Sequence, residues 1–164
     1  KFNIPYKKLK MYDLPSKNDL KKIQPVFCSY FFKWDSNEHL NIAKSYGFKE
    51  LETPNEGTYR KFVGIDELIN RLHQFIKVLK FGYGRATDHA CEDIRLGKLS
   101  RKEAKDLIRQ YDLEPLSNKY LSHISNFLGY SENELQLILE KFRNKKIWKQ
   151  NDNQEWFIPN HIID

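Results

Sequence analysis

The stretch Lys80-Phe-Gly-Tyr-Gly-Arg-Ala-Thr-Asp-His-Ala-Cys-Glu-Asp-Ile-Arg-Leu-Gly97 sets two glycines directly before a run of ionisable side chains. If a helix begins near Arg85, successive side chains advance by about 100° and two faces separate. Small or apolar residues fall on one face, where they let a neighbouring helix approach closely. The other face carries Arg85, Asp88, His89, Glu92, Asp93 and Arg95. The sequence therefore predicts a helix that keeps packing and chemistry on separate faces.

The two glycines strengthen the prediction of a site. Gly82 and Gly84 allow backbone angles that other residues avoid, and Thr87 or Asp88 is placed to cap the helix. Free N–H groups at a helix start attract anions, so we expect a phosphate or sugar phosphate near Arg85. The pattern matches neither G-x-x-x-x-G-K-[ST] nor G-x-G-x-x-G. The ordinary alternative is a solvated charged face, whose pairs contribute only about 0.2–0.5 kcal/mol each.

The C-terminal half reads as a series of helices with recognisable ends. Apolar residues recur at threes and fours from residue 65 to residue 79, which predicts a buried stripe on a helix leading to Gly82. Ser100 and Ser131 each precede a glutamate by three residues, the capping-box pattern of a helix start. Another helix is expected between Ser117 and Gly129.

The N-terminal part is less regular. Residues 1–24 resemble an extended connector with one short helix after Ser16, and the aromatic stretch 25–34 predicts a short strand. A capping box at 35–38 predicts a helix that stops at Gly47. Pro54, Gly57 and Gly64 make the segment 49–64 a loop, which we expect to close over the site.

The tail predicts a two-stranded hairpin, with Ile147-Trp148-Lys149 and Glu155-Trp156-Phe157-Ile158 as its arms. The fold class expected is therefore mainly α: a helical, bundle-like C-terminal half, a short N-terminal strand and helix region, and a C-terminal β-hairpin. We divide the chain into a connector (1–24), a strand-helix-loop segment that continues an N-terminal α/β nucleotide domain (25–64), and a helical C-terminal domain (65–164).

The residues from Lys80 to Ala104 closely resemble a segment of the N-acetyl sugar amidotransferases of bacterial surface-glycan synthesis. The resemblance continues in shorter motifs upstream and covers most of residues 25–143. Those motifs are Phe32-Lys33-Trp34-Asp35, Ile42-Ala43-Lys44-Ser45-Tyr46-Gly47-Phe48-Lys49, Glu56-Gly57-Thr58-Tyr59-Arg60 and Leu72-His73-Gln74.

The resemblance implies a reaction and its partners. In that family an ATP-pyrophosphatase domain, using ATP and Mg²⁺, activates the N-acetyl oxygen of a nucleotide-linked sugar. Ammonia from a glutaminase subunit then displaces AMP and leaves an acetamidino group. The present chain corresponds to the C-terminal portion, because it lacks the Ser-Gly-Gly-x-Asp-Ser loop and opens with Lys1. We expect a part that is inactive and cofactor-free alone, whose missing N-terminal ATP-binding domain completes the enzyme.

The resemblance leaves two pathways open, synthesis of the O-antigen of lipopolysaccharide and synthesis of nonulosonic acids such as pseudaminic and legionaminic acid. Together with the helical geometry, it assigns roles to the polar residues. Carboxylates or the imidazole would accept sugar hydroxyls or take a proton from ammonia. Guanidinium groups would bind phosphate oxygens. The catalytic candidates are Asp88, His89, Glu92 and Asp93, in an order that one sequence does not fix. The binding candidates are Lys80, Gly82, Tyr83, Gly84, Arg85, Thr87 and Arg95.

Composition leaves two other functions open. The 164-residue chain has a formal charge of +6, which also fits a basic helical module that binds DNA or RNA. Its lysine clusters are split between 7–10, 21–22 and 141–146, so a solvated surface is the preferred interpretation over nucleic-acid binding. A helical docking or assembly domain is the third possibility.

Other classes of protein are not expected. Cys28 and Cys91 are far apart and lack C-x-x-C spacing, so they predict reduced thiols and no metal site. No apolar run approaches the length of about 18 residues that a membrane span needs, and no export signal is present. A cytoplasmic protein without a membrane partner is expected.

Overall fold

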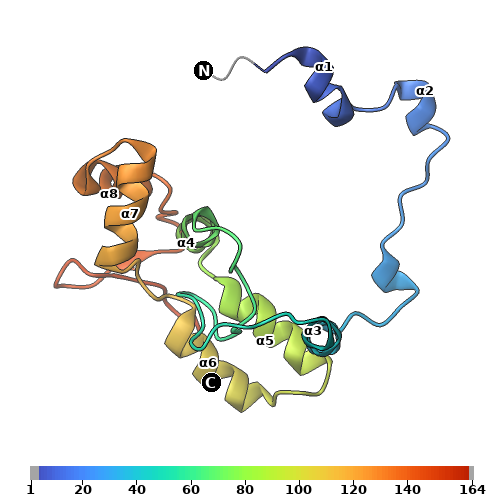
Figure 1. Cartoon of the computed structure of the whole chain (residues 1–164). Helices are drawn as coiled ribbons and strands as arrows, with labels where there is room; N and C mark the ends of the chain where they lie inside the picture. Colours follow the sequence, from blue (N-terminus) through green and yellow to red (C-terminus); the bar gives the residue numbers. More distant parts are fainter. Residues whose placement is uncertain (1–3, 163–164) are drawn as a thin grey trace. The chain divides into compact units, whose positions relative to one another are not determined.

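The computed structural model describes residues 4–162, which divide into two compact units at the boundary between Ser36 and Asn37. The first unit consists of single helical turns joined by extended segments (Figure 1). Its elements are α1 (Tyr6–Leu9), η1 (Lys10–Tyr12), α2 (Lys17–Leu20) and η2 (Cys28–Tyr30). The short helix expected after Ser16 is present, because the Ser16 hydroxyl accepts a hydrogen bond from the Asp19 N–H and caps α2.

The prediction of a strand over residues 25–34 is wrong. This stretch holds the 3₁₀ turn η2 and otherwise irregular backbone, and most of its large side chains are exposed. A strand needs a neighbour to receive its backbone hydrogen bonds. Within residues 4–162 the single ladder joins β1 to β2, so the segment has no strand to pair with. Its aromatic composition indicated a strand, but composition alone does not supply the partner.

The second unit is mainly helical, as expected. Its helices are α3 (Ser36–Ser45), which starts at the boundary, α4 (Ile69–Phe81), α5 (Arg85–Arg95), α6 (Arg101–Tyr111), α7 (Asn118–Leu128) and α8 (Glu132–Glu140). Strands β1 (Lys149–Gln150) and β2 (Trp156–Phe157) form the expected antiparallel hairpin, with Lys149 opposite Phe157. The segment 49–64 is a loop, also as expected. Helix length and hydropathy in the described chain nowhere reach what crossing a bilayer requires.

Local signals set most helix starts. The Ser100 and Ser131 hydroxyls accept from the N–H three residues on, and the glutamate there accepts from the serine N–H, which completes both capping boxes. Helix α4 starts at Ile69, four residues later than expected. Its first turn is held by Tyr120 of α7, whose hydroxyl accepts from the Leu72 N–H at 2.9 Å and donates to the Leu68 carbonyl at 2.5 Å. A distant side chain therefore decides where α4 begins.

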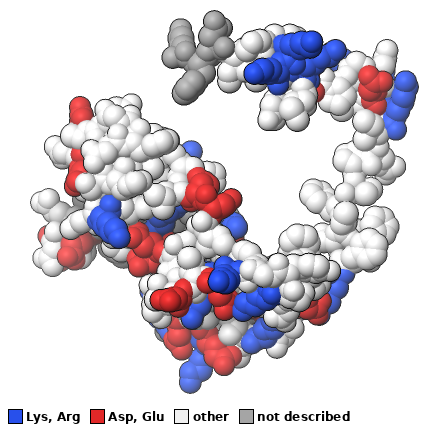
Figure 2. Space-filling view, viewed as in Figure 1, with Lys and Arg blue, Asp and Glu red and all other residues white. Residues whose placement is uncertain are grey.

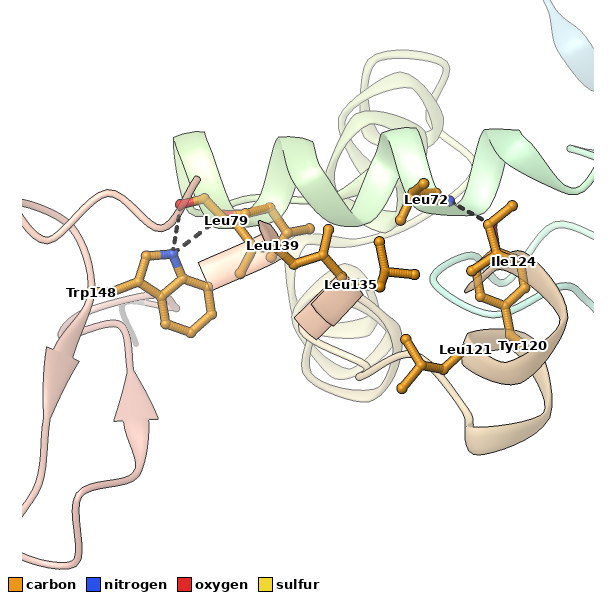
Figure 3. Packing of buried hydrophobic residues seen from close by; sticks show 9 residues of the cluster. Leu72, Leu79, Tyr120, Leu121, Ile124, Leu135, Leu139 and Trp148 are labelled. Carbon is orange, nitrogen blue, oxygen red and sulfur yellow. Dashed lines mark hydrogen bonds between the residues drawn. The ribbon is translucent and has the colours of Figure 1, made fainter. Parts of the chain in front are cut away.

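The hydrophobic core lies between α4, α7, α8 and the hairpin (Figure 3). Leucine and isoleucine side chains from three helices interdigitate there, with Trp148 closing one end. The buried cluster contains Leu72, Val78, Leu79, Tyr120, Leu121, Ile124, Leu135, Leu139 and Trp148. Each fully buried side chain of this size contributes about 1.5–3 kcal/mol relative to exposure, so this cluster is the main stabilising element of the unit.

The C-terminal tail closes the end of α4. The Trp148 indole N–H donates to the Leu79 carbonyl at 3.1 Å (Figure 3). The Asn144 N–H donates to the same carbonyl at 3.0 Å. The Leu79 carbonyl lies in the last turn of α4, where carbonyls have no partner within the helix. Gly82 ends α4 in the left-handed region, at φ +77°. The tail thus fixes the point from which the chain turns into α5.

Gly82 and Gly97 both have left-handed backbone angles, but they differ in what a side chain would contact. Comparing substitutions at the two positions therefore distinguishes backbone strain from a steric clash. A Cβ on Gly82 would lie 2.6 Å from Ile147 Cγ2, whereas a Cβ on Gly97, at φ +71°, would meet no atom within 4 Å. We expect Gly97→Ala to lower the free energy of unfolding by about 1–2 kcal/mol, the strain of that backbone region. Gly82→Ala should cost about 1–3 kcal/mol more, because it also overpacks Ile147. Urea denaturation measures both, and equal losses would contradict the packing at Ile147.

Candidate functional site

The start of α5 is occupied by a carboxylate of the protein itself. Asp112, which follows α6, accepts hydrogen bonds from the Gly84 N–H at 2.8 Å, the Thr87 N–H at 3.0 Å and the Thr87 hydroxyl at 2.9 Å. Helices α5 and α6 lie side by side, which brings this carboxylate to the helix start (Figure 1). Thr87 and Asp88 therefore do not cap α5 with their side chains, contrary to the sequence-based expectation. A negative charge belongs at this position, and Asp112 supplies it.

Asp112 is buried and held as a carboxylate. Burial alone would raise the pKa of Asp112, but hydrogen bonds from His161, Gly84 and Thr87 bring it below its ordinary value. The ring Nε2 of His161 lies 3.2 Å from the carboxylate. Gly84 is required for this approach, because a Cβ there would lie 2.8 Å from both the main-chain carbonyl oxygen and the Oδ1 of Asp112.

A loop that we call the strap, residues 55–64, lies across the polar face of α5. Arg60 of the strap donates to Glu92 at 2.9 Å and to Asp93 at 2.7 Å, and the Tyr59 hydroxyl donates to Asp93 at 2.5 Å. Burial alone would lower the pKa of Arg60, yet its contacts with both carboxylates raise it. These two carboxylates therefore hold the strap in place.

His89 is the imidazole beneath the strap. Its Nδ1 lies 3.0 Å from the Thr58 hydroxyl, which also accepts from the Arg60 N–H at 3.1 Å. Burial, followed by the positive charges of Arg60 and Arg85, lowers the pKa of His89 to about 3. The ring is thus neutral at neutral pH. A general base works best with a pKa near the working pH, so this environment does not suit His89 to proton transfer.

The remaining predicted residues lie in several places. Asp88 accepts from Lys77 of α4 at 2.5 Å, and that ammonium also sits 4.4 Å from the centre of the Tyr83 ring. Lys80 lies over the Phe142 ring at 4.9 Å, and Arg95 is exposed. The predicted arc of α5 exists, but its groups do not all face one space.

A cavity of about 810 Å³ opens between the strap, α4, α7 and the start of α5. Its volume is within the range of about 300–1,000 Å³ usual for small-molecule sites. Of the residues that the sequence predicted for the site, Arg85 lines this cavity and the others lie outside its lining. The lining residues are Asn55, Glu56, Thr58, Val63, Gly64, Glu67, Leu68, Asn70, Arg71, Gln74, Arg85, Ser117, Lys119, Tyr120, Ser122, His123 and Asn126.

Two arginines line the cavity in different states. Arg71 donates to the Glu114 carbonyl at 2.7 Å and to Glu56 at 3.4 Å, and burial lowers its pKa. Arg85 differs, because its buried Nε has no hydrogen-bond partner in residues 4–162. The Oε1 atom of Gln74 is likewise buried without a partner. An unsatisfied buried polar group costs about 1–3 kcal/mol, which makes both atoms candidates for ligand contacts.

The sequence interpretation missed the part of the site on α4 and α7. On α7 the cavity residues recur at threes and fours as Lys119, Ser122, His123 and Asn126, beside the core stripe of the same helix. That periodicity was available as a signal, since it marks a continuous polar face. It did not distinguish a site from ordinary solvated surface. The partners that turn this face into a cavity wall come from the strap and α4.

Comparison with known proteins gives one match. A family model described as LPS biosynthesis protein WbpG-like, C-terminal domain, matches residues 56–161. The chain belongs to this family. The matched range runs from the strap to His161, so it spans the family member's cavity, with the exception of Asn55, together with the Asp112 contacts. The domain is therefore one of lipopolysaccharide biosynthesis proteins. No curated protein matches the chain.

The charge distribution of this family member does not form one basic tract. Acidic and basic side chains are interleaved over the face of the second unit in Figure 2. The lysine clusters at 7–10 and 21–22 belong to the first unit, whereas 141–146 belongs to the second. Across residues 4–162, nowhere do three His, Cys, Asp or Glu side chains gather in a way that could hold a metal ion.

The depressed pKa of His89 predicts how stability depends on pH. Below pH 6.5 the unfolded chain binds a proton at this imidazole while the folded domain does not, until the pH nears 3. The contribution of His89 is thus complete above pH 6.5 and is lost as the pH falls toward 3. Between pH 6.5 and 5 the loss is on the order of 1 kcal/mol.

The measurement is urea denaturation of the wild type and His89→Gln at several pH values. The stability difference between the two proteins should shift by that amount between pH 6.5 and 5, with the variant less sensitive to acid. Parallel pH profiles would show that His89 titrates normally in the folded domain.

Proposed function

We propose that this domain is the C-terminal part of an ATP-dependent amidotransferase of lipopolysaccharide biosynthesis. Its substrate would be a nucleotide-linked N-acetyl sugar, whose N-acetyl oxygen leaves with AMP. Ammonia from a glutaminase subunit would supply the nitrogen of the acetamidino group that results. The family match supports the pathway, and the resemblance of residues 80–104 supports the reaction.

The observation that carries the proposal is the position of Arg85. It stands at the first residue of α5, lines the cavity, and has a buried Nε without a partner in the described chain. A guanidinium group binds the oxygens of a phosphate through a planar pair of donors. Because Asp112 already fills the helix start, the phosphate would bind to the Arg85 side chain and not to the backbone N–H groups of α5.

The rest of the lining fits the sugar part of such a ligand. Side-chain amides and hydroxyls line the walls, and these groups exchange hydrogen bonds with sugar hydroxyls in either direction. The amide and hydroxyl groups are those of Asn55, Asn70, Gln74, Asn126, Thr58, Ser117, Tyr120 and Ser122. Two apolar side chains, Val63 and Leu68, add the apolar surface that ligand pockets usually carry.

The acidic face of α5 would then act by positioning. Glu92 and Asp93 hold Arg60, and Arg60 holds the strap that forms one cavity wall. We assign ATP and Mg²⁺ to another part of the full-length protein, because the described residues offer no group of carboxylates for the metal ion. In this proposal the chain binds and orients the sugar nucleotide, and a separate domain activates it.

The test compares the two arginines that line the cavity. Arg85→Met should weaken binding of UDP-N-acetylglucosamine or UDP-N-acetylgalactosamine by about 10- to 100-fold, since a charged hydrogen bond contributes about 1.5–3 kcal/mol. Its melting temperature without ligand should not fall, because the substitution removes a buried unsatisfied N–H. Arg71→Met should instead destabilise the domain, because Glu56 and the Glu114 carbonyl lose their donor.

Calorimetric titration and thermal melting of the chain provide these measurements. Saturating ligand should stabilise the wild type, by about 2.7 kcal/mol at 100 times the Kd, and should stabilise Arg85→Met far less at equal concentration. In the full-length protein supplied with ATP and ammonium, mass spectrometry should detect replacement of the N-acetyl oxygen by NH. Absence of both sugar-nucleotide binding and amidination in the wild type would refute the proposed function.

A further inference from the structure

The α4 wall of the cavity contains a hydrogen-bond acceptor that no protein group uses. Asn70, Arg71 and Gln74 lie on one face of α4 and line the cavity together. Arg71 is fully engaged with the main chain and with Glu56. Gln74 is half-buried, and its Oε1 atom is buried without a hydrogen-bond partner in residues 4–162.

The orientation of the Gln74 amide is set by its neighbour one turn earlier. The Gln74 Nε2 donates to Asn70 Oδ1 at 3.4 Å, which uses the donor side of the amide and leaves the carbonyl oxygen as the free group. A carbonyl oxygen only accepts hydrogen bonds. The group that completes this part of the cavity must therefore bring an N–H or O–H.

Within the sugar part of the proposed substrate, one group has an N–H as its only polar hydrogen, the acetamido group. It also carries a methyl group, and the same cavity has the apolar side chains of Val63 and Leu68. A site that offers a buried acceptor discriminates strongly against a ligand without the donor, because the acceptor would then stay unpaired. Sugar hydroxyls have amides and hydroxyls elsewhere in the lining.

We propose that Gln74 is a specificity residue that accepts the N–H of the acetamido group and so selects N-acetyl sugars over sugars with no hydrogen-bond donor at that position. This inference rests on the proposed function, since it takes a nucleotide-linked sugar as the ligand. It assigns Arg85 to the phosphate end and Gln74 to the sugar end of one ligand. Gln74 acts by binding and orienting the acetamido group, not by transferring a proton.

The experiment measures the ratio of two affinities in the wild-type chain and in Gln74→Leu. The ligands are UDP-N-acetylglucosamine and UDP-2-deoxyglucose, which share the nucleotide and differ at the acetamido position, where the second ligand has no hydrogen-bond donor. We expect the wild type to prefer the N-acetyl ligand by at least 10-fold, and Gln74→Leu to lose most of that preference while its affinity for UDP-2-deoxyglucose changes less than 3-fold. The change in the affinity ratio between the wild type and Gln74→Leu measures the interaction between Gln74 and the acetamido group.

A second readout separates a binding role from a structural one. Gln74→Leu should melt at or above the wild-type temperature without ligand, because it removes a buried unpaired oxygen. The matched control is Gln136→Leu on the exposed surface of α8, which should alter neither the preference nor the affinity. In the full-length protein, Gln74→Leu should raise the KM for the N-acetyl sugar, with kcat reduced less than KM is raised.

The outcomes distinguish this inference from the function on which it rests. If the wild type binds neither ligand and the full-length protein forms no acetamidino product, the proposed function fails and the assignment of Gln74 fails with it. If the wild type binds the N-acetyl ligand and Gln74→Leu retains the preference, only the assignment of Gln74 is overturned. A lower melting temperature in Gln74→Leu with an unchanged preference would show that Gln74 is structural.

Discussion

The buried carboxylate of Asp112 is the contact on which the geometry of the site depends. It ties the residue that follows α6 to the start of α5 through three hydrogen bonds, one from Gly84, which precedes α5, and two from Thr87 in its first turn. Because these bonds fix both the position and the direction of α5, they also fix Arg85 at the cavity and His89, Glu92 and Asp93 beneath the strap. A carboxylate at a helix start is favoured by the partial positive charge there.

A second set of contacts gives the cavity its outer wall. Arg60 reaches the two α5 carboxylates, and the strap that carries it contributes residues to the cavity lining. Breaking a buried ion pair by removing one partner leaves an uncompensated charge, so the strap and the polar face of α5 depend on each other. The charge-rich helix that attracted notice in the sequence is thus largely an attachment surface. The ligand space lies beside it.

The sequence predicted those features that local chemistry determines. Ser100 and Ser131 indicate helix starts because each lies three residues before its capping glutamate. Gly82 and Gly129 indicate helix ends because the left-handed backbone angle there depends on the glycine itself. Contacts between distant residues could not be predicted in this way. Asp112 follows Thr87 by a whole helix and a turn, and nothing in its neighbours distinguishes it from a solvated aspartate. The late start of α4 depends on Tyr120, and the strand expected over 25–34 lacked a partner strand.

Of the candidate site, the sequence located Arg85 at a helix start. Gln74 became noticeable only in the structure, where its Oε1 atom is buried beside the cavity without a hydrogen-bond partner among the described residues.

The contact between His161 and Asp112 bears on how the domain is made. His161, at the end of the matched range, contacts the Asp112 carboxylate. Trp148, also late in the chain, donates to the Leu79 carbonyl at the end of α4. On the ribosome, helices α4 to α6 emerge before either partner, so their pairing is incomplete until Trp148 and His161 have also emerged. Contacts of such long sequence separation slow folding relative to local ones. The nascent domain therefore reaches its final arrangement only after His161 has emerged, and until then the end of α4 and the Asp112 carboxylate lack their C-terminal partners.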